Sequence, residues 1–341
     1  MVSFIFMEIQ KKYDVVGIGS PLLDFIINVG DSVLERVDLV KGEMCLINKK
    51  RSVEILEALI ESSVTTAPGG SSANTLAGVS ALGGSAVFIG KIGQDNHGTI
   101  YEQKTGDDDV LSRMQTHETE ATGHAITFIT PDGERTFATH LGAAIHFRKA
   151  DIIDEDIAQS KILHLEGYQL EDPELKEAVV HAMKIAKENF TKVSIDLSDP
   201  ALVGRNLEPI RDLVKEYVDI VFVNEQEAEA FTGKKDEDAL HDIYELCDIA
   251  VVKLGERGSL VKTDGQVYTI AGHNVEVKNT NGAGDMYAGA FLYAITHDIG
   301  YEKAGKIASF ASAQVVSAEL ARLDSDLKGK VKHYIIDIIN T

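Results

Sequence analysis

The sequence predicts an α/β protein whose central, mostly parallel sheet is covered by helices on both faces. Short apolar segments bounded by turn residues alternate along the chain with longer segments of helical periodicity. Strands that are apolar over their whole length are typical of parallel sheets buried on both faces. The 341 residues contain no internal repeat, low-complexity tract or linker rich in Pro, Gly or Ser. We therefore expect a single domain, residues 1–341, with a small β-flap as an appendage.

The central sheet is predicted from six apolar segments that end in turn residues. They are residues 13–19, 85–92, 161–165, 192–197, 219–223 and 249–254. Helices fit between consecutive strands, as the crossover connections of a parallel sheet require. One helix is predicted over residues 173–190, because Pro173 suits the first turn of a helix.

Two further regions alternate apolar with polar residues and predict a second, smaller sheet. Residues 124–130 and 134–140 flank Pro131-Asp132-Gly133, which is a β-hairpin signal. Residues 25–29 and 43–48 also have the composition of extended segments. We expect residues of about 24–50 and 122–146 to form a lid over the functional site.

Bulk composition limits the classes of function. The formal net charge of −21 argues against nucleic acid as a partner, since that requires a basic patch. The two cysteines, Cys45 and Cys247, lack metal-ligand spacing and are expected to be reduced thiols. Residues 1–7 are too short for a signal-peptide core, and no apolar run approaches the ~20 residues of a membrane span. We expect a cytoplasmic protein with no membrane partner.

The run Asn279-Thr280-Asn281-Gly282-Ala283-Gly284-Asp285 indicates a phosphoryl-transfer site. Its glycines let the backbone bend so that several N–H groups face one point, and the apolar residues 286–295 that follow predict a buried helix. A helix N-terminus favours an anion such as phosphate. A carboxylate at this position suits a base that removes a proton from an attacking hydroxyl. The alternative is an ordinary helix start with an acidic first-turn residue.

A second glycine-rich segment, residues 68–84, favours the functional interpretation. Gly69 and Gly70 allow a ligand to approach the backbone, and Ser71 or Ser72 suits a helix N-cap. Asn74 then lies in the first turn, where its amide offers a donor and an acceptor to a polyol hydroxyl.

Together these two segments resemble the two signatures of the ribokinase-like (PfkB-type) family of carbohydrate and nucleoside kinases. The signatures are Gly-Gly-x-x-x-Asn near the N-terminus and Asp-Thr-x-Gly-Ala-Gly-Asp near the C-terminus. Further family-like pieces occur in the expected order at residues 17–24, 90–98, 132–136, 224–227 and 253–258. The resemblance covers roughly residues 13–323 and implies a ribokinase-like fold with a β-flap lid.

The resemblance also implies roles for individual residues. Asp285 is the implied base, and the amides of Gly282, Ala283 and Gly284 are the implied anion hole. The implied acceptor-binding residues are Ser20, Asp24, Gly69, Gly70, Asn74, Arg135 and Tyr168. The implied ATP-binding residues are Asn224, Glu227, Lys253, Gly255, Gly258, His273 and Asn281.

Mg²⁺ is the implied cofactor of ATP, held through water by Asn224 and Glu227. Each assignment has a simpler structural alternative. Asp24 suits a loop cap, Asn224 and Glu227 suit an exposed helix start, and Arg135 suits a solvated hairpin residue.

The acceptor is predicted from a closer similarity within the family. Ser20-Pro21-Leu22-Leu23-Asp24 resembles the Asn-Pro-Leu-Leu-Asp of adenosine kinases, with Ser20 in place of the Asn. Residues 165–168 resemble a segment of bacterial adenosine-kinase-like members, and Tyr168 is suited to stack on a nucleobase. We therefore predict ATP-dependent phosphorylation of a nucleoside, adenosine at its 5′-hydroxyl, as in purine salvage.

Two other functions stay open at this stage. One is a sugar kinase acting on ribose, fructose or a related furanose, and the other is a catalytically silent nucleoside-binding protein. Asn279 stands where the family usually has an Asp near a monovalent-cation site, so activation by potassium is not expected. The lid is compatible with either a monomer or a homodimer.

Overall fold

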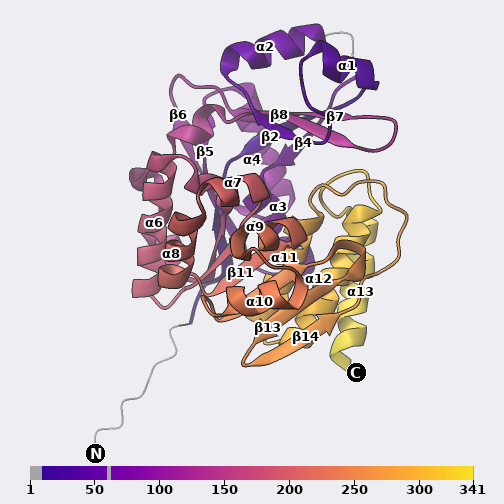
Figure 1. Ribbon diagram of the computed structural model, residues 1–341. Helices are drawn as coiled ribbons and strands as arrows, with labels where there is room; N and C mark the ends of the chain where they lie inside the picture. The colour runs from indigo at the N-terminus through magenta and orange to yellow at the C-terminus, as the bar shows by residue number, and fades with distance from the viewer. Residues whose placement is uncertain (1–9, 60–62, 341) are drawn as a thin grey trace, which may run out of the picture.

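A computed structural model describes residues 10–59 and 63–340, which form one large sheet, one small sheet and the helices around them (Figure 1). The expectation that residues 1–7 are not a signal peptide concerns residues outside this described part. Among the helices of the described part, none has both the length and the apolar character needed to cross a lipid bilayer.

The large sheet is mostly parallel, as predicted. Its nine strands lie in the order β14-β13-β12-β11-β10-β9-β1-β5-β6, parallel from β12 to β6 and antiparallel at β13 and β14. Their bounds are β1 Tyr13–Ile18, β5 Ala86–Gly93, β6 Leu111–His117, β9 Ser160–Glu166, β10 Lys192–Asp196, β11 Ile220–Asn224, β12 Ile249–Lys253, β13 Ser259–Thr263 and β14 Gln266–Ile270. All six predicted strands are present, and each end lies within one residue of its predicted position.

Strands β6, β13 and β14 lie outside the predicted set, for two different reasons. Strand β6 is a half-exposed edge strand of mostly polar residues, so it carries no apolar run. Strands β13 and β14 form a hairpin closed by Asp264 and Gly265, both with positive φ. Asp-Gly is a strong hairpin signal, so this pair is recognisable in the sequence.

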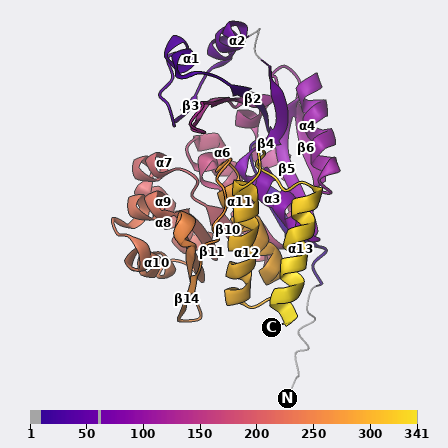
Figure 2. The same ribbon diagram turned by 90° about the vertical axis from the view of Figure 1, so that its right-hand side faces the viewer.

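Helices cover both faces of the large sheet, which confirms the predicted architecture. On β11, Ile220 and Phe222 belong to one hydrophobic cluster and Val221 to the other, because successive side chains of a strand point to opposite faces. The first face carries α3 Ser71–Leu82, α11 Ala283–Thr296, α12 Tyr301–Val316 and α13 Ser325–Asn340, the last three side by side in Figures 1 and 2.

The opposite face carries α5 Asp154–Ala158, α6 Pro173–Glu188, α7 Pro200–Arg205, α8 Leu207–Tyr217, α9 Glu225–Thr232 and α10 Asp236–Tyr244. The predicted helix 173–190 is therefore confirmed, with Pro173 in its first turn and Asp172 as its N-cap. Helix α4 Asn96–Asp107 packs beside β5 and β6. Short 3-10 helices cover Gly142–His146, Lys149–Asp151, Gly167–Leu170 (η3) and Gly255–Arg257.

The small sheet lies over one end of the large one (Figure 1). Its order is β3-β8-β7-β2-β4, with β2 Leu22–Asn28, β3 Met44–Leu46, β4 Thr65–Gly69, β7 Gly123–Ile129 and β8 Arg135–His140. Helices α1 Asp31–Arg36 and α2 Lys49–Ala58 share a separate hydrophobic cluster with its strands. Strand β4 adds residues that the predicted lid segments leave out. It contains Pro68, which an edge strand tolerates.

Helices α3 and α11 cross at an unusually short distance. A Cβ atom on Gly289 of α11 would lie 2.4 Å from the carbonyl oxygen of Thr75 and 3.2 Å from the Cα of Gly78, both on α3. Only glycine allows the two backbones to approach this closely. Helix α3 begins at Ser71 and helix α11 at Ala283, and the crossing sets the distance between these two N-termini.

Replacing Gly289 with alanine tests this constraint. We expect Gly289→Ala to lower the free energy of unfolding by about 1–3 kcal/mol, because the added methyl group overpacks a helix crossing. Urea denaturation measures the change. The control is Gly106→Ala in α4, where a Cβ meets no atom within 4 Å and stability should be unchanged or slightly higher. Equal stabilities for the two variants would contradict the constraint.

Candidate active site

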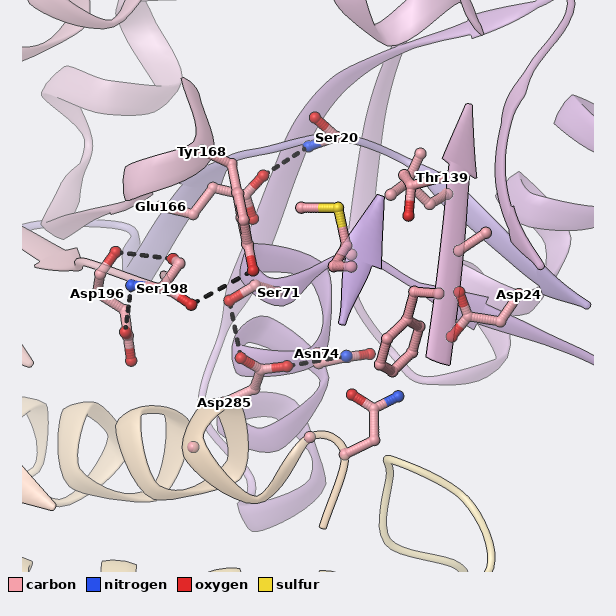
Figure 3. A pocket seen from close by; sticks show the side chains of 18 of the residues that line it. Ser20, Asp24, Ser71, Asn74, Thr139, Glu166, Tyr168, Asp196, Ser198 and Asp285 are labelled. Atoms are coloured by element: carbon pink, nitrogen blue, oxygen red, sulfur yellow. Dashed lines mark hydrogen bonds between the residues drawn. The ribbon is translucent and has the colours of Figure 1, made fainter. Parts of the chain in front are cut away.

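A cavity of about 350 Å³ lies between the small sheet and the carboxyl edge of the large sheet (Figure 3). Its polar side is formed by Ser71, Asn74, Glu166, Asp196, Asn224, Glu227, Lys253 and Asp285. Its apolar side is formed mainly by the small sheet and the segments that flank it, through Leu22, Met44, Leu46, Ala125, Phe137 and Leu141. A ligand here meets hydrogen-bonding groups on one side and hydrocarbon on the other.

Asp285 is held in the first turn of α11 by two side chains of α3 (Figure 3). The Ser71 hydroxyl donates to Oδ1 at 2.7 Å, and the Asn74 amide donates to Oδ2 at 2.9 Å. Burial raises the pKa of Asp285 to about 6, although these two hydrogen bonds oppose the shift. A carboxylate with this pKa is ionised at neutral pH and is a stronger base than an ordinary aspartate.

The start of α3 differs from the sequence prediction. Neither Ser71 nor Ser72 caps the helix, because Gly70 occupies the N-cap position with φ of 96°. Ser71 turns to Asp285 instead. A Cβ on Gly70 would lie 2.3 Å from the carbonyl oxygen of Ser20, so only glycine fits there.

Asp24 forms the far wall of the cavity. A Cβ on Gly69 would lie 2.5 Å from its Oδ1, so this glycine makes room for the carboxylate. Burial raises the pKa of Asp24 to about 7, while the charges of Arg322 and Arg135 act in the opposite direction. Of the predicted acceptor-binding residues, Ser20, Asp24, Gly70, Asn74 and Tyr168 line this cavity.

Arg135 lies on the other side of Asp24, in a smaller cavity of about 250 Å³. This residue is only 8% exposed, and its Nε has no hydrogen-bond partner among residues 10–59 and 63–340. The alternative of a solvated hairpin residue is therefore wrong. Burial lowers the pKa of this guanidinium, and the nearby Asp24 carboxylate opposes that shift.

Glu166 is a site residue outside the predicted set. It ends β9 beneath the cavity, is 2% exposed, and accepts hydrogen bonds from the backbone N–H of Ser20 at 3.2 Å and of Ser72 at 2.8 Å. Burial raises its pKa to about 7, and the two N–H donors oppose the shift. One carboxylate thus joins the turn before β2 to the start of α3. The signal that identifies it is an acidic residue directly after an apolar parallel strand.

A second cavity, of about 590 Å³, adjoins the first. The two share Asn224, Lys253, Thr280 and Gly284. Of the other predicted ATP-binding residues, Gly255, Gly258 and His273 line the second cavity. Asn281 and Glu227 line the first cavity instead. His273 packs edge-on against Phe310, with ring centroids 5.2 Å apart.

Lys253 lies where the two cavities meet. Its ammonium forms an ion pair with Asp196 at 2.5 Å, and both side chains are largely buried. A Cβ on Gly284 would lie 3.1 Å from Nζ, so the ammonium reaches the first turn of α11. Burial lowers the pKa of Lys253, but the Asp196 and Glu227 carboxylates outweigh this effect and the pKa is raised. The lysine therefore stays charged.

Asn224 and Glu227 form a capping box at the start of α9. The Asn224 N–H and Nδ2 donate to the two carboxylate oxygens of Glu227 at 2.8 and 2.6 Å, and the Glu227 N–H donates to Asn224 Oδ1 at 2.9 Å. The two residues do form a helix start, but it is not the exposed one that the structural alternative describes, because Glu227 is only 2% exposed. Burial, followed by the charge of Asp196, raises the pKa of Glu227 to about 7.

This pair fits Mg²⁺ bound through water. Its oxygen donors suit a hard cation, and a divalent charge would relieve the repulsion between Glu227 and Asp196. Within residues 10–59 and 63–340, no three His, Cys, Asp or Glu side chains are grouped so as to cage a metal directly.

The turn before α11 is held by Asn279, which is 2% exposed. Its Oδ1 accepts from the Asn281 N–H at 2.8 Å, and its Nδ2 donates to the Glu319 carbonyl at 2.9 Å. Gly282 is the N-cap of α11 with φ of 76°. The Ala283 N–H already has a long bond, 3.3 Å, to the Thr280 carbonyl. Gly284 lies in the first turn, where an α-helix offers its N–H no partner.

Two adjoining cavities that share a helix N-terminus and one lysine suit the donor and the acceptor of a phosphoryl group. This arrangement is that of a kinase acting on an alcohol. The sequence pattern described as pfkB family carbohydrate kinase matches residues 40–327, so the chain belongs to this family. It is therefore an ATP-dependent kinase with an alcohol acceptor.

Individual relatives divide between two kinds of acceptor. The 5-dehydro-2-deoxygluconokinase of Halalkalibacterium halodurans is 32% identical over 262 residues, 73% of this chain and 79% of that protein. The adenosine kinase of Sinorhizobium meliloti has a TM-score of 0.88 and 34% identity over 95% of this chain and 99% of that one. A probable sugar kinase of Rhizobium etli has a TM-score of 0.89 and 32% identity with the same coverages.

The buried Glu166 gives a test of the site's construction. We expect Glu166→Gln to lower the free energy of unfolding by about 1–3 kcal/mol, because the Ser20 and Ser72 N–H groups donate to different oxygens of Glu166, and glutamine would turn an NH2 group toward one of these donors. The control is Glu171→Gln, which removes an exposed ion pair with Arg205 and should cost less than about 1 kcal/mol. Chemical denaturation compares the two. A cost for Glu166→Gln no larger than the control's would refute the bridging role.

Proposed function

We propose that the protein transfers the γ-phosphoryl group of ATP to the primary hydroxyl of a nucleoside, with adenosine converted to AMP. The observation that carries this proposal is the apolar side of the acceptor cavity. Leu22, Met44, Leu46 and Phe137 face a space that a free sugar, with hydroxyl groups all around its ring, cannot fill favourably. A nucleobase is flat and largely apolar on its faces, so it suits this wall.

The polar side of the same cavity suits the ribose. Asp24 and Asn74 offer hydrogen-bond acceptors and donors to its hydroxyl groups. Tyr168, fixed by a 3.3 Å bond to the Ser198 carbonyl, lines the same cavity on the side of Glu166 (Figure 3). The likeness to the Sinorhizobium meliloti adenosine kinase, at 34% identity and nearly full coverage, supports this choice.

The proposed chemistry follows from the positions of Asp285 and α11. The acceptor hydroxyl lies against the Asp285 carboxylate and gives up its proton to Oδ as the oxygen attacks the γ-phosphorus in line. The bond from this phosphorus to the β,γ-bridging oxygen breaks, and ADP leaves with that bond's electron pair. The N-terminus of α11 at Gly282 and Gly284, together with the Lys253 ammonium, stabilises the charge on the transferring group. Mg²⁺, held through water by Asn224 and Glu227, would neutralise the charge of the ATP phosphates.

A carbohydrate acceptor is the second candidate. It is favoured by the relatives named 5-dehydro-2-deoxygluconokinase, and the Asp24, Asn74 and Asp285 side chains would serve a sugar equally well. A catalytically silent binding protein is disfavoured, because Asp285, the glycine turn and Lys253 are all in place. Potassium activation is not part of the proposal. The Asn279 amide is neutral, and it is already hydrogen-bonded to the Asn281 N–H and the Glu319 carbonyl.

The role of Asp285 gives the first test. We expect Asp285→Asn to lower kcat by about 10²–10⁴-fold, because the amide cannot accept the hydroxyl proton. The stabilisation of the variant by adenosine in a thermal-shift assay should be largely retained. Near-normal turnover would show that Asp285 is not the base.

A panel of acceptors tests the substrate class. Adenosine should raise the Tm by about 2–5 °C, whereas ribose and fructose at the same concentration should not. The Tm shift with inosine, compared with that of adenosine, tests whether the protein recognises the polar edge of the purine base. Asp24→Ala is the matched control, because loss of its carboxylate should abolish the adenosine shift without changing stabilisation by ATP. Stabilisation by free sugars and none by nucleosides would exclude the nucleoside proposal and select the second candidate.

A further inference from the structure

A continuous chain of hydrogen bonds connects Asp285, the proposed catalytic base, to Arg322, which lies outside the acceptor cavity. Arg322, in the loop between α12 and α13, donates from Nε to Asn74 Oδ1 at 2.9 Å and from Nη1 to Asp108 at 2.6 Å. Asn74 in turn donates from Nδ2 to Asp285. The Arg322 side chain is 13% exposed.

The order of donors along this chain fixes the orientation of one amide. An asparagine has a carbonyl side that accepts and an amino side that donates, and an arginine Nε can only donate. With Arg322 on one side, Asn74 must turn its oxygen toward the guanidinium. Its amino group then faces the Asp285 carboxylate. Without that donor, rotation of the amide would bring its oxygen against the carboxylate, where two acceptors repel.

We propose that Arg322 is a positioning residue that sets the orientation of the Asn74 amide and, through it, holds the Asp285 carboxylate for proton transfer. This inference rests on the proposed role of Asp285 as the base. Arg322 lines two neighbouring cavities but not the cavity that contains Asp285, so it acts through Asn74 rather than on the acceptor. Asp108, after the last residue of α4, anchors the far side of the guanidinium.

The pKa of Asp285 should depend on the orientation of the Asn74 amide. The hydrogen bond from Asn74 lowers the pKa of this carboxyl, against the larger effect of burial, so its loss moves the pKa upward. Other charged groups near the carboxylate come from the strands of both sheets, and Arg322 lowers the pKa of one of them, Asp24, through its charge. These groups are Asp24 on β2, Glu166 on β9, Asp196 on β10 and Lys253 on β12.

The test is the pH dependence of kcat for Arg322→Met in the full-length protein, with adenosine and saturating Mg·ATP. The acid limb should move up by about one pH unit, so that kcat falls about tenfold at about pH 5.5 and less than about threefold at about pH 8.5. The KM for ATP should stay unchanged. A uniform loss at all pH values, or an unshifted acid limb, would overturn the proposal.

Two further variants separate positioning from general damage. Asp108→Asn breaks the outer ion pair but leaves the Nε bond to Asn74, and its acid limb should stay close to that of the wild type. Arg322→Met should add little further shift in an Asn74→Ala background, because its positioning effect on Asp285 passes through that amide. Additive effects in the double variant would contradict this route.

Some outcomes concern the proposed function and not this inference. If the wild type phosphorylates a sugar and not adenosine, the same pH profiles measured with that sugar test Arg322 equally well. If Asp285→Asn is as active as the wild type, the proposed function fails first, and the inference fails with it. If Arg322→Met does not fold, Arg322→Lys replaces it. Lysine has a methylene group in place of the arginine Nε, so it loses the donor to Asn74 but keeps a charge beside Asp108. It should shift the acid limb in the same direction, and an unshifted limb would again overturn the proposal.

Discussion

Helices α3 and α11 lie so close at Gly78 and Gly289 that a Cβ atom at position 289 would collide with the α3 backbone, and the geometry of the site follows from this crossing. Each helix begins with a glycine in the left-handed region, Gly70 and Gly282, so that both N-termini open toward the same cavity. The first turn of one helix then supplies the donors, Ser71 and Asn74, and the first turn of the other supplies the carboxylate that they hold. A wider crossing would separate the base from the groups that orient it.

The site concentrates negative charge in a region with little water. Burial raises the pKa of Asp24, Glu166, Glu227 and Asp285, and a raised acid pKa has a definite cost. The stability that each group contributes when protonated is lost as pH rises from its unfolded value, near 4, through its folded value of about 6 to 7. At neutral pH the folded protein therefore carries destabilising carboxylates where chemistry needs them, and the Lys253 ammonium offsets them only in part.

Much of this arrangement is predictable from the sequence. The apolar strands are recognisable because burial on both faces leaves them almost no polar residues, and the two glycine-rich turns are recognisable because few other residues fit them. The serines at the start of α3 show the limit: a serine before a helix suggests a cap, but Ser71 instead bonds Asp285, 214 positions away. Arg322 is missed for the same reason, since its partners come from distant segments and it lies in no recognisable motif. Glu166 follows a recognisable apolar strand, but its partners, the N–H groups of Ser20 and Ser72, are also far away in the sequence. Long-range hydrogen bonds leave no local periodicity in the sequence.

In the proposed complex, the acceptor hydroxyl binds between the Asp285 carboxylate and the N-terminus of α11. A crystal structure with adenosine and a non-hydrolysable ATP analogue measures this directly. We expect the 5′-oxygen at about 2.6–3.2 Å from a carboxylate oxygen of Asp285 and in line with the γ-phosphorus, with the adenine base against the apolar wall of the small sheet. An adenosine bound with its 5′-oxygen away from Asp285, or a γ-phosphate remote from Gly284, would contradict this arrangement.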